Sequence, residues 1–273
     1  MANGSYCETE NCGHGRRTSI TTAMKYSSFT NPLHSHEHSL QTLNLLYEYD
    51  DFMESVATVV DLGSGSDLHD IEWWTTRTTR DEEQIPLEIQ GTAVDLELPD
   101  RAVDHVSFVK HDIHTLSENK RPFDVLWCHD VFQYLHNPYQ ALASWRNIAD
   151  DDAMLVLAFP QTVSMHYNVQ AFDLLPGHCF HYTMTSLIYM LAVNGWDCNG
   201  GFFKKHAEDP WLHAIVYKSS QEPLPPGTSW YELMETGLLP DTAAKSVFKH
   251  GYVRQQDLVL PWLDKSLTWM AQQ

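Results

Sequence analysis

Short apolar runs alternate with amphipathic stretches through the middle of the chain. Runs rich in β-branched and aromatic residues, each bounded by polar or turn-forming residues, predict strands. There are seven: Ala57–Leu62, Thr92–Leu96, Val106–Lys110, Phe123–Cys128, Met154–Phe159, Trp196–Phe203 and Trp211–Tyr217. The last of these alternates cleanly between apolar and polar positions, which is typical of a strand with two different faces.

Helical spacing of apolar residues fills most of the gaps between these strands. Helices are expected from about Ser39 to Met53, through Ile71 and Trp74, and from about Thr183 to Val193, where Gly195 is placed to end the last one.

The best-marked helix begins at Asn137, a suitable N-cap, with Pro138 in the first helical position. Its expected buried stripe comprises Ala141, Leu142, Trp145 and Ile148. We expect Asp150–Asp152 to separate this helix from the next strand.

Strands separated by helices predict parallel pairing and an open α/β sheet. The closing pair of strands has only a short loop between them, so it should be antiparallel. The predicted core covers residues 55–218, after an N-terminal leader and helical cover at 1–54. Beyond the proline-rich segment SSQEPLPPG, residues 219–273 are expected to form a helical C-terminal appendage.

The composition limits which binding partners and which cellular compartment are expected. The 273 residues carry a formal charge of −19, from 36 acidic and 17 basic side chains, so nucleic acid is not expected as a partner. No run approaches the roughly 20 apolar residues of a membrane span, so we expect a soluble protein without a membrane partner. The start lacks the apolar core of a secretory signal, and the five cysteines do not suggest a disulfide framework, which makes the cytoplasm the expected location.

The segment VVDLGSGSDLHD, residues 59–70, is the first candidate binding site. Gly63 and Gly65 allow a tight turn and a close approach of backbone to ligand after the first strand. Asp61 puts a carboxylate where a phosphate site would exclude one. The turn therefore favours a ligand that carries an ammonium or sulfonium group and no phosphate.

Two more acids follow the next two strands. Asp95 ends the second strand, where a carboxylate can accept hydrogen bonds from both ribose hydroxyls. Asp112 follows the third strand and is placed to meet an exocyclic amine. Three carboxylates at three successive strand ends predict one binding site for an adenosine compound.

With these motifs, residues 55–218 resemble the class I S-adenosylmethionine-dependent methyltransferases, in the small-molecule branch that includes quinone-biosynthesis methyltransferases. The similarity lies in VVDLGSGS, AVDLE, VKHDIHTL, FDVLWCHDVFQYLHNP and HYTMTSLIYMLAVNGWD. It implies a Rossmann-like, mostly parallel seven-stranded sheet with an antiparallel last strand, S-adenosyl-L-methionine as the cofactor, and methyl transfer to an acceptor that is expected to be a small molecule.

The resemblance also implies roles for individual residues. Asp61, Gly63, Ser64 and Gly65 would line the methionine end of the cofactor, Asp95 and Leu96 the ribose, and Asp112 and Ile113 the adenine. His129 and Asp130 would lie beside the transferring methyl group. No metal ligand is implied.

The chain departs from the family pattern at three places. Ser66 replaces the third glycine, and Gln133-Tyr134 stands where the family often has Glu-His, so no role is carried over to that pair. Asp61 and Asp95 are 34 positions apart (95 − 61), more than the usual ~20. We interpret the extra residues, WWTTRTTRDEEQIPLEIQ, as an insertion near the site or a lengthened loop.

A general base is needed only when the acceptor carries a proton near neutral pH. Among 16 histidines, His129 is the first candidate for that base, and His136 and His166 come next. The aromatic and polar surfaces open to an acceptor outside the core motifs are Tyr26, His34–His38, Trp73–Trp74 and the C-terminal tryptophans, which include Trp262 and Trp269.

Three other interpretations of the function stay open. A nicotinamide-dependent oxidoreductase would share the fold, but the third glycine of its fingerprint is Leu68 here. A metal hydrolase could use His34, His36 and His38, which share one face of an extended strand and resemble the HxHxDH segment of metallo-β-lactamase-like hydrolases, without its Asp-His ending. The chain could also be a non-catalytic partner protein that keeps the fold. Cys7 and Cys12 with His14 form a looser candidate metal site, and the sequence predicts no oligomeric state.

Overall fold

A computed structural model describes residues 55–78, 85–97, 99–117, 122–160, 179–180, 182–205 and 211–258. Its centre is a sheet of seven strands, as predicted. The strands are β1 (Thr58–Leu62), β2 (Gln90–Asp95), β3 (Val106–Lys110), β4 (Phe123–His129), β5 (Ala149–Pro160), β6 (Trp196–Lys205) and β7 (Trp211–Lys218).

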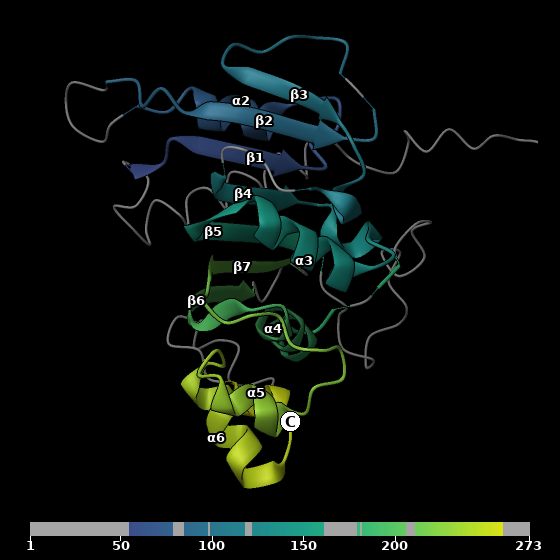
Figure 1. Cartoon of the computed structure of the whole chain (residues 1–273), viewed down its shortest axis with the longest axis vertical. Helices are drawn as coiled ribbons and strands as arrows, with labels where there is room; N and C mark the ends of the chain where they lie inside the picture. Colours follow the sequence, from purple (N-terminus) through teal and green to yellow (C-terminus); the bar gives the residue numbers. More distant parts are fainter. Residues whose placement is uncertain are drawn as a thin grey trace, which may run out of the picture.

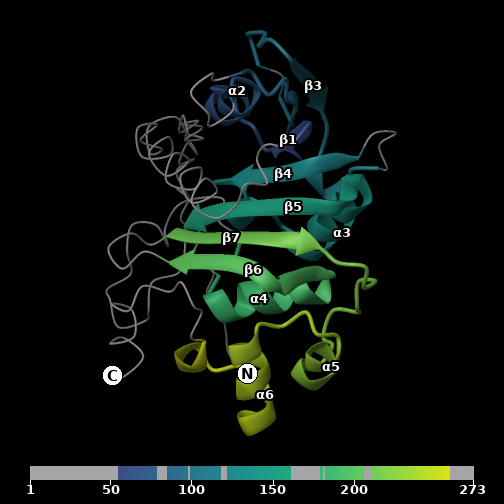
Figure 2. The same ribbon diagram turned by 90° about the vertical axis from the view of Figure 1, so that its left-hand side faces the viewer.

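The strand order is β3-β2-β1-β4-β5-β7-β6. The pairs among β1 to β5 are parallel, whereas β7 runs antiparallel to both β5 and β6 (Figure 2). The order reverses between β1 and β4, which is the point where open α/β sheets bind ligands. The start of β7 lies beside the end of β5 because the two strands run in opposite directions.

Three helices cover the two faces of this sheet (Figure 1). α2 (His69–Thr75) packs on one face through Ile71 and Trp74. α3 (Pro138–Ile148) and α4 (Met184–Val193) pack on the other face. The predicted cap is present, since the Asn137 side chain accepts a hydrogen bond from the backbone of Gln140, and Thr183 forms a capping box with Ser186 at the start of α4.

The strand β5 begins earlier than predicted. Asp150–Asp152 do not separate α3 from the strand, because β5 starts at Ala149, directly after the helix. Ala149 is in register with Phe123 of β4, and the three acidic side chains are exposed. Pairing with β4 extends the strand, and exposed carboxylates at its start remain solvated at no cost in burial.

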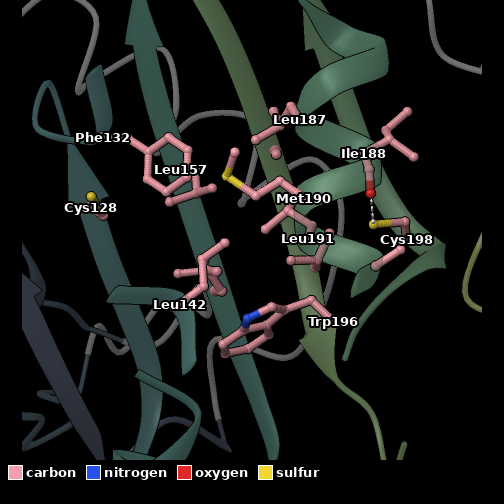
Figure 3. Close-up of a cluster of buried hydrophobic side chains, with 14 of the residues drawn as sticks. Cys128, Phe132, Leu142, Leu157, Leu187, Ile188, Met190, Leu191, Trp196 and Cys198 are labelled. Atoms are coloured by element: carbon pink, nitrogen blue, oxygen red, sulfur yellow. Dashed lines mark hydrogen bonds between the residues drawn. The ribbon is translucent and has the colours of Figure 1, made fainter. Parts of the chain in front are cut away.

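The larger hydrophobic cluster lies between the sheet and the helices α3 and α4. Figure 3 shows Leu142 and Leu157 facing Leu191 and Trp196, with the thiol of Cys198 donating a hydrogen bond to the carbonyl of Ile188 at 3.7 Å. The side chains at the centre of this cluster are fully buried.

The segment after β7 is helical over the part that is described. α5 (Trp230–Glu235) and α6 (Asp241–His250) lie beyond β6 at the edge of the sheet (Figure 1). Leu233 and Val247 belong to the larger cluster, and the backbone N–H of Cys198 donates to the carbonyl of Leu238 at 3.0 Å. The domain boundaries at 54/55 and 218/219 stay predictions.

Several predicted features lie outside the described residues. They are the helix Ser39–Met53 with the rest of the N-terminal cover, Cys7, Cys12, His14, Tyr26, His34–His38, His166, Trp262 and Trp269. Among the residues that are described, no helix is both long and apolar enough to cross a membrane.

Candidate functional site

The glycine turn joins β1 to α2 and is folded tightly against its neighbours. The backbone N–H of Gly63 donates to the carbonyl of Val94 at 2.8 Å. Gly63 has φ +84°, and a Cβ there would lie 2.6 Å from Cγ2 of Val131. The turn therefore needs glycine for its conformation and for the close approach of the loop after β4.

Asp95 ties the glycine turn to the end of β2. Its Oδ2 accepts from the backbone N–H of Gly65 at 3.0 Å, and its Oδ1 accepts from the N–H of Glu97 at 3.2 Å. A carboxylate has about four lone-pair sites, so these two bonds leave acceptor capacity for hydroxyl groups of a ligand. Asp95, which is predicted to bind the ribose, is therefore hydrogen-bonded to the glycine turn, which is predicted to bind the methionine end of the cofactor.

Asp61 is a buried carboxyl group, with only 3% of its surface exposed. Burial raises the pKa of Asp61 well above its usual range, and the nearby charges of Asp70, Asp67 and Asp95 raise it further. A cationic ligand group would reverse these effects, because it would compensate the buried charge. The electrostatics therefore favour an ammonium or sulfonium group, as the sequence indicated.

A second acid and an imidazole lie on the α2 face beside Asp61. Asp70, in the first turn of α2, accepts a hydrogen bond from the indole Nε1 of Trp127 at 2.9 Å. Its Oδ2 is 3.7 Å from Nδ1 of His129. The His129 ring stacks on Trp127, with centroids 6.0 Å apart and 11° between the planes. His129, the first candidate base, is thus buried beside a carboxylate, a neighbour that the sequence analysis did not find.

Asp112 caps a short 3₁₀ turn, Ile113–Thr115, after β3. Its Oδ1 accepts from the backbone N–H of His114 at 2.9 Å and lies 2.6 Å from Nδ1 of the same residue. These bonds lower the pKa of Asp112, the backbone bond most, so the carboxylate is ionised. The ring of His114 lies against that of His136, with centroids 3.9 Å apart and 37° between the planes. The candidate base His136 therefore lies beside Asp112, at the predicted adenine side.

Ile113 is anchored to the rest of the core by its backbone. Its carbonyl accepts hydrogen bonds from Oγ of Ser144 at 3.1 Å and from Nε1 of Trp145 at 2.9 Å. Both donors belong to α3. The predicted adenine side of the site is therefore fixed to the helix that covers the opposite face of the sheet.

Asp130 directly follows β4 in the left-handed conformation, with φ 55°. Its backbone N–H donates to the carbonyl of Ala158 at 2.8 Å. The amide of Gln133 donates to Oδ1 of Asp130 at 2.6 Å and to its carbonyl at 3.1 Å. Gln133 thus fixes Asp130 in the left-handed conformation, which is uncommon for residues other than glycine. Gln133, to which the resemblance assigned no role, thus positions Asp130.

An aromatic surface borders Asp130. Tyr134 and Phe180 are 37% and 40% exposed, and Phe180 packs near the buried ring of Tyr182, with centroids 6.1 Å apart. The backbone N–H groups of Cys179 and Phe180 both donate to the carbonyl of Gln133. The prediction for Trp73–Trp74 was wrong at Trp74, which is fully buried against Trp127 in the core.

Of the extra residues between Asp61 and Asp95, Trp73–Thr75 belong to α2, and the described residues 76–78 and 85–89 form a connection that leads into the amino end of β2. Thr78 and Pro86 form an antiparallel bridge, and the N–H of Leu87 donates to the carbonyl of Arg77 at 2.9 Å. Asp95 lies at the other end of β2. The described part of this connection therefore fits the lengthened loop better than an insertion near the site.

Comparison with known proteins agrees with this geometry. Residues 60–157 match the family model described as "Methyltransferase domain". A putative methyltransferase from Haloferax volcanii, solved in complex with the Trm112 methyltransferase activator, has a TM-score of 0.52 and 14% identity, over 70% of this chain and 93% of its own. A comparison with curated proteins gives no match.

Two further solved structures are similar at lower scores. The 1,6-didemethyltoxoflavin-N1-methyltransferase of Burkholderia thailandensis, with bound S-adenosylhomocysteine, has a TM-score of 0.44 and 15% identity, over 68% of this chain and 90% of its own. The N-methyltransferase NodS of Bradyrhizobium japonicum has a TM-score of 0.45 and 16% identity, over 70% and 99%.

The sheet order, the acid-and-glycine turn at its reversal point and the family match together define a Rossmann-like transferase core. Residues 60–157 form a methyltransferase domain with the class I fold, and S-adenosylmethionine is the cofactor that this family uses. The predictions of fold, enzyme class and cofactor are confirmed, in preference to the oxidoreductase and the metal hydrolase. The described residues contain no cluster of side chains that could hold a metal ion.

Proposed function

We propose that this protein transfers the methyl group of S-adenosylmethionine to a small-molecule acceptor. The observation that carries the proposal is the buried carboxyl group of Asp61 beside the glycine turn. It suits the cationic end of this cofactor and would repel a phosphate. The aromatic surface of Tyr134 and Phe180 supports a small, flat acceptor rather than a polymer.

The arrangement of the strand ends supports the cofactor-binding set. Asp61, Gly63, Ser64 and Gly65 would hold the amino-acid end, and Asp95 would accept from the ribose hydroxyls. Leu96 exposes 64% of its apolar surface next to Asp95, where a nucleoside would cover it. Asp112 and Ile113 would then meet the adenine, with the ionised carboxylate accepting from the exocyclic amine.

When bound, the cofactor supplies a methyl group that the sulfonium already activates for in-line displacement. The protein has to hold the acceptor atom behind that methyl and keep water out, which can lower the barrier by several kcal/mol. Asp130, held by Gln133, lies at the end of β4 beside the expected methyl position. His129, oriented by Asp70, would accept the proton of an acceptor that carries one.

The acidic character of the site supports an acceptor that is neutral or cationic. Asp61, Asp67, Asp70, Asp95 and Asp130 all lie around the glycine turn and the end of β4. An anionic acceptor would be repelled by these carboxylates when water is excluded.

Two measurements test the proposal. Calorimetry with S-adenosylhomocysteine should give saturable binding, and NADH in parallel should give none. Cofactor labelled in its methyl group should then label the low-molecular-mass filtrate of a cell extract and leave the protein fraction unlabelled. Label confined to the protein fraction would contradict the small-molecule acceptor, and absence of S-adenosylhomocysteine binding would contradict the cofactor site.

A further inference from the structure

Two chain segments leave the site edge of the sheet from neighbouring strands. One is the glycine turn, which leads from β1 to α2, and the other is the connection from β2 to β3. The hydrogen bond from the N–H of Gly65 to Oδ2 of Asp95 joins them where they leave the strands. Because these are the segments predicted to bind the methionine end and the ribose of the cofactor, their relative position sets the shape of that part of the site.

Arg101, in the connection from β2 to β3, joins the same two segments a second time. Its Nη1 donates to Oε1 of Glu72 at 3.1 Å, and its Nη2 donates to Oε2 at 2.7 Å. Nη2 also donates to the backbone carbonyl of Asp67 at 2.6 Å. A guanidinium that binds a carboxylate through two parallel bonds fixes the relative orientation of the two groups. Arg101 therefore fixes the end of the glycine turn and the first turn of α2 relative to the segment that follows Asp95.

The carbonyl of Asp67 precedes an unusual backbone conformation. The next residue, Leu68, is the N-cap of α2, is left-handed with φ 59° and is fully buried. This conformation is uncommon for residues other than glycine, and Leu68 has no side-chain hydrogen bond to cap the helix. The bond from Arg101 therefore fixes the peptide between Asp67 and Leu68 at the point where the turn enters the helix.

The connection that carries Arg101 is itself held against α2. Val103, two residues further on, packs against the hydrophobic cluster that contains Ile71 and Trp74 of α2. The carbonyl of Val103 accepts from the backbone N–H of Val106, the first residue of β3, at 3.3 Å. Arg101 thus lies next to an anchored segment, from which its side chain can hold the glycine turn in place.

The charge of Arg101 is opposite to that of the acids around the glycine turn. The hydrogen bonds from Arg101 lower the pKa of Glu72, so that this carboxylate is ionised beside the guanidinium. S-adenosylmethionine has a net positive charge, which a guanidinium repels and carboxylates attract. By charge alone, removal of Arg101 would therefore tighten cofactor binding. A role in positioning the two segments predicts the opposite result, so the sign of the change distinguishes the two roles.

We propose that Arg101 is a positioning residue for S-adenosylmethionine, which fixes the glycine turn and α2 to the segment after Asp95 and so keeps this carboxylate in place for the ribose. It acts through the carbonyl of Asp67 and the carboxylate of Glu72, and not on the reacting atoms. The inference rests on the proposed function, because it concerns the site of that cofactor.

The first test compares Arg101→Gln with Arg254→Gln, which removes the same charge elsewhere. Arg254 forms a similar bidentate pair with Asp257, at 2.6 and 2.7 Å, after α6 at the far end of the sheet from β2 (Figure 1). Calorimetry with S-adenosylmethionine, without an acceptor, should give a dissociation constant about fivefold higher in Arg101→Gln, the most that one exposed ion pair usually supplies. Arg254→Gln should stay within about twofold of the wild type.

Arg101→Lys separates the geometry of the contact from its charge. Lysine keeps the positive charge but cannot form the two parallel bonds to Glu72. We expect this variant to bind S-adenosylmethionine about threefold more weakly than the wild type does. Wild-type affinity in Arg101→Lys, or tighter binding in Arg101→Gln, would show that Arg101 acts through its charge alone and would overturn the positioning role.

Amide hydrogen exchange tests the same contact in the unliganded protein. In Arg101→Gln the amide of Gly65, which donates to Asp95, should exchange at least about threefold faster than in the wild type. The amide of Cys198, which donates to the carbonyl of Leu238 beside the appendage, should exchange at the wild-type rate. Unchanged exchange at Gly65 would overturn the proposal. Equal acceleration at Cys198 would overturn it too, because it would show a general loss of stability.

The proposed function and this inference fail in different ways. A wild type that does not bind S-adenosylmethionine would overturn the proposed function, and the inference with it. A wild type that binds the cofactor, with the same affinity in Arg101→Gln, would overturn the inference alone and leave the methyltransferase assignment intact.

Discussion

The two faces of the sheet differ in the kind of residue that they bury. On the α3/α4 face the buried strand residues are all apolar, such as Leu126, Leu157 and Val216. On the α2 face the same strands bury Asp61, His129 and His213 near the edge that carries the site. Buried polar groups lower the stability of the folded state unless they are compensated. The α2 face therefore contributes less to the free energy of unfolding than the α3/α4 face does.

This division places chemistry and stability on opposite sides of one sheet. The apolar side holds the strands in register, and register is what aligns His129 with His213 and Asp61 with Trp127. Substitutions on one face should therefore change the free energy of unfolding, and substitutions on the other should change ligand binding. The predictions below test that separation, from the largest effect to the smallest.

The largest effect is expected at Leu191 in α4. Leu191 is fully buried in the α3/α4 cluster (Figure 3), so Leu191→Ala should lower the free energy of unfolding by about 2–5 kcal/mol, from lost transfer energy and a cavity. Urea unfolding measures this change. Leu96→Ala is the matched control, since Leu96 is exposed and should change stability by less than about 0.5 kcal/mol. An equal loss of stability in Leu191→Ala and Leu96→Ala would contradict this expected difference.

Much of this architecture could be predicted from local patterns. β-Branched runs and helical spacing predicted all seven strands, and the three acids at successive strand ends were expected at one edge because the ends of parallel strands meet there. The cap at Asn137 was also predicted, since a cap depends on residues only three positions away.

The contacts that define the chemistry of the site could not be predicted from local sequence patterns. Asp70 meets Trp127 across 57 positions, and His213 lines up with His129 only through the pairing of β4, β5 and β7. A one-residue shift in register would turn His213 to the other face, so its place depends on the packing of the whole sheet. Sequence spacing alone contains no signal for such a contact.

The next effect concerns the two glycines of the turn. Gly63→Ala and Gly65→Ala each force a residue into positive φ, at about 1 kcal/mol. At Gly63 the new Cβ also meets the side chain of Val131, whereas Gly65 has open space around it. We therefore expect a loss of about 2–3 kcal/mol for Gly63→Ala in urea unfolding, the excess being overpacking. The double variant Gly63→Ala/Val131→Ala should recover that excess relative to Val131→Ala, and no recovery would exclude the steric explanation.

Asp61→Asn should change stability and binding in opposite directions. Because burial raises the pKa of Asp61, the folded protein retains a proton that the unfolded chain releases, and the stability of the unliganded protein falls as pH rises above the ordinary value of 3.8. At pH 7 the asparagine removes that penalty, so the melting temperature of the unliganded protein should rise. Binding of S-adenosylhomocysteine should weaken by about 1.5–3 kcal/mol, through loss of a charged partner for its ammonium group. A variant that is both less stable and equally good at binding would show that Asp61 has a structural role instead.

The smallest effect is the pH dependence of cofactor binding. The ammonium group of the ligand pairs with the ionised form of Asp61, whereas burial and the carboxylates of Asp70, Asp67 and Asp95 favour the protonated form in the unliganded protein. Affinity for S-adenosylhomocysteine should therefore rise with pH up to the raised pKa of Asp61, by at most about tenfold per pH unit for a single proton, and then level off. Calorimetry in buffers of different ionisation enthalpy measures the proton released on binding. In Asp61→Asn this release and the rise should both vanish, and if they persisted unchanged, the titrating group would be another residue and the buried carboxyl of the α2 face would have no part in ligand binding.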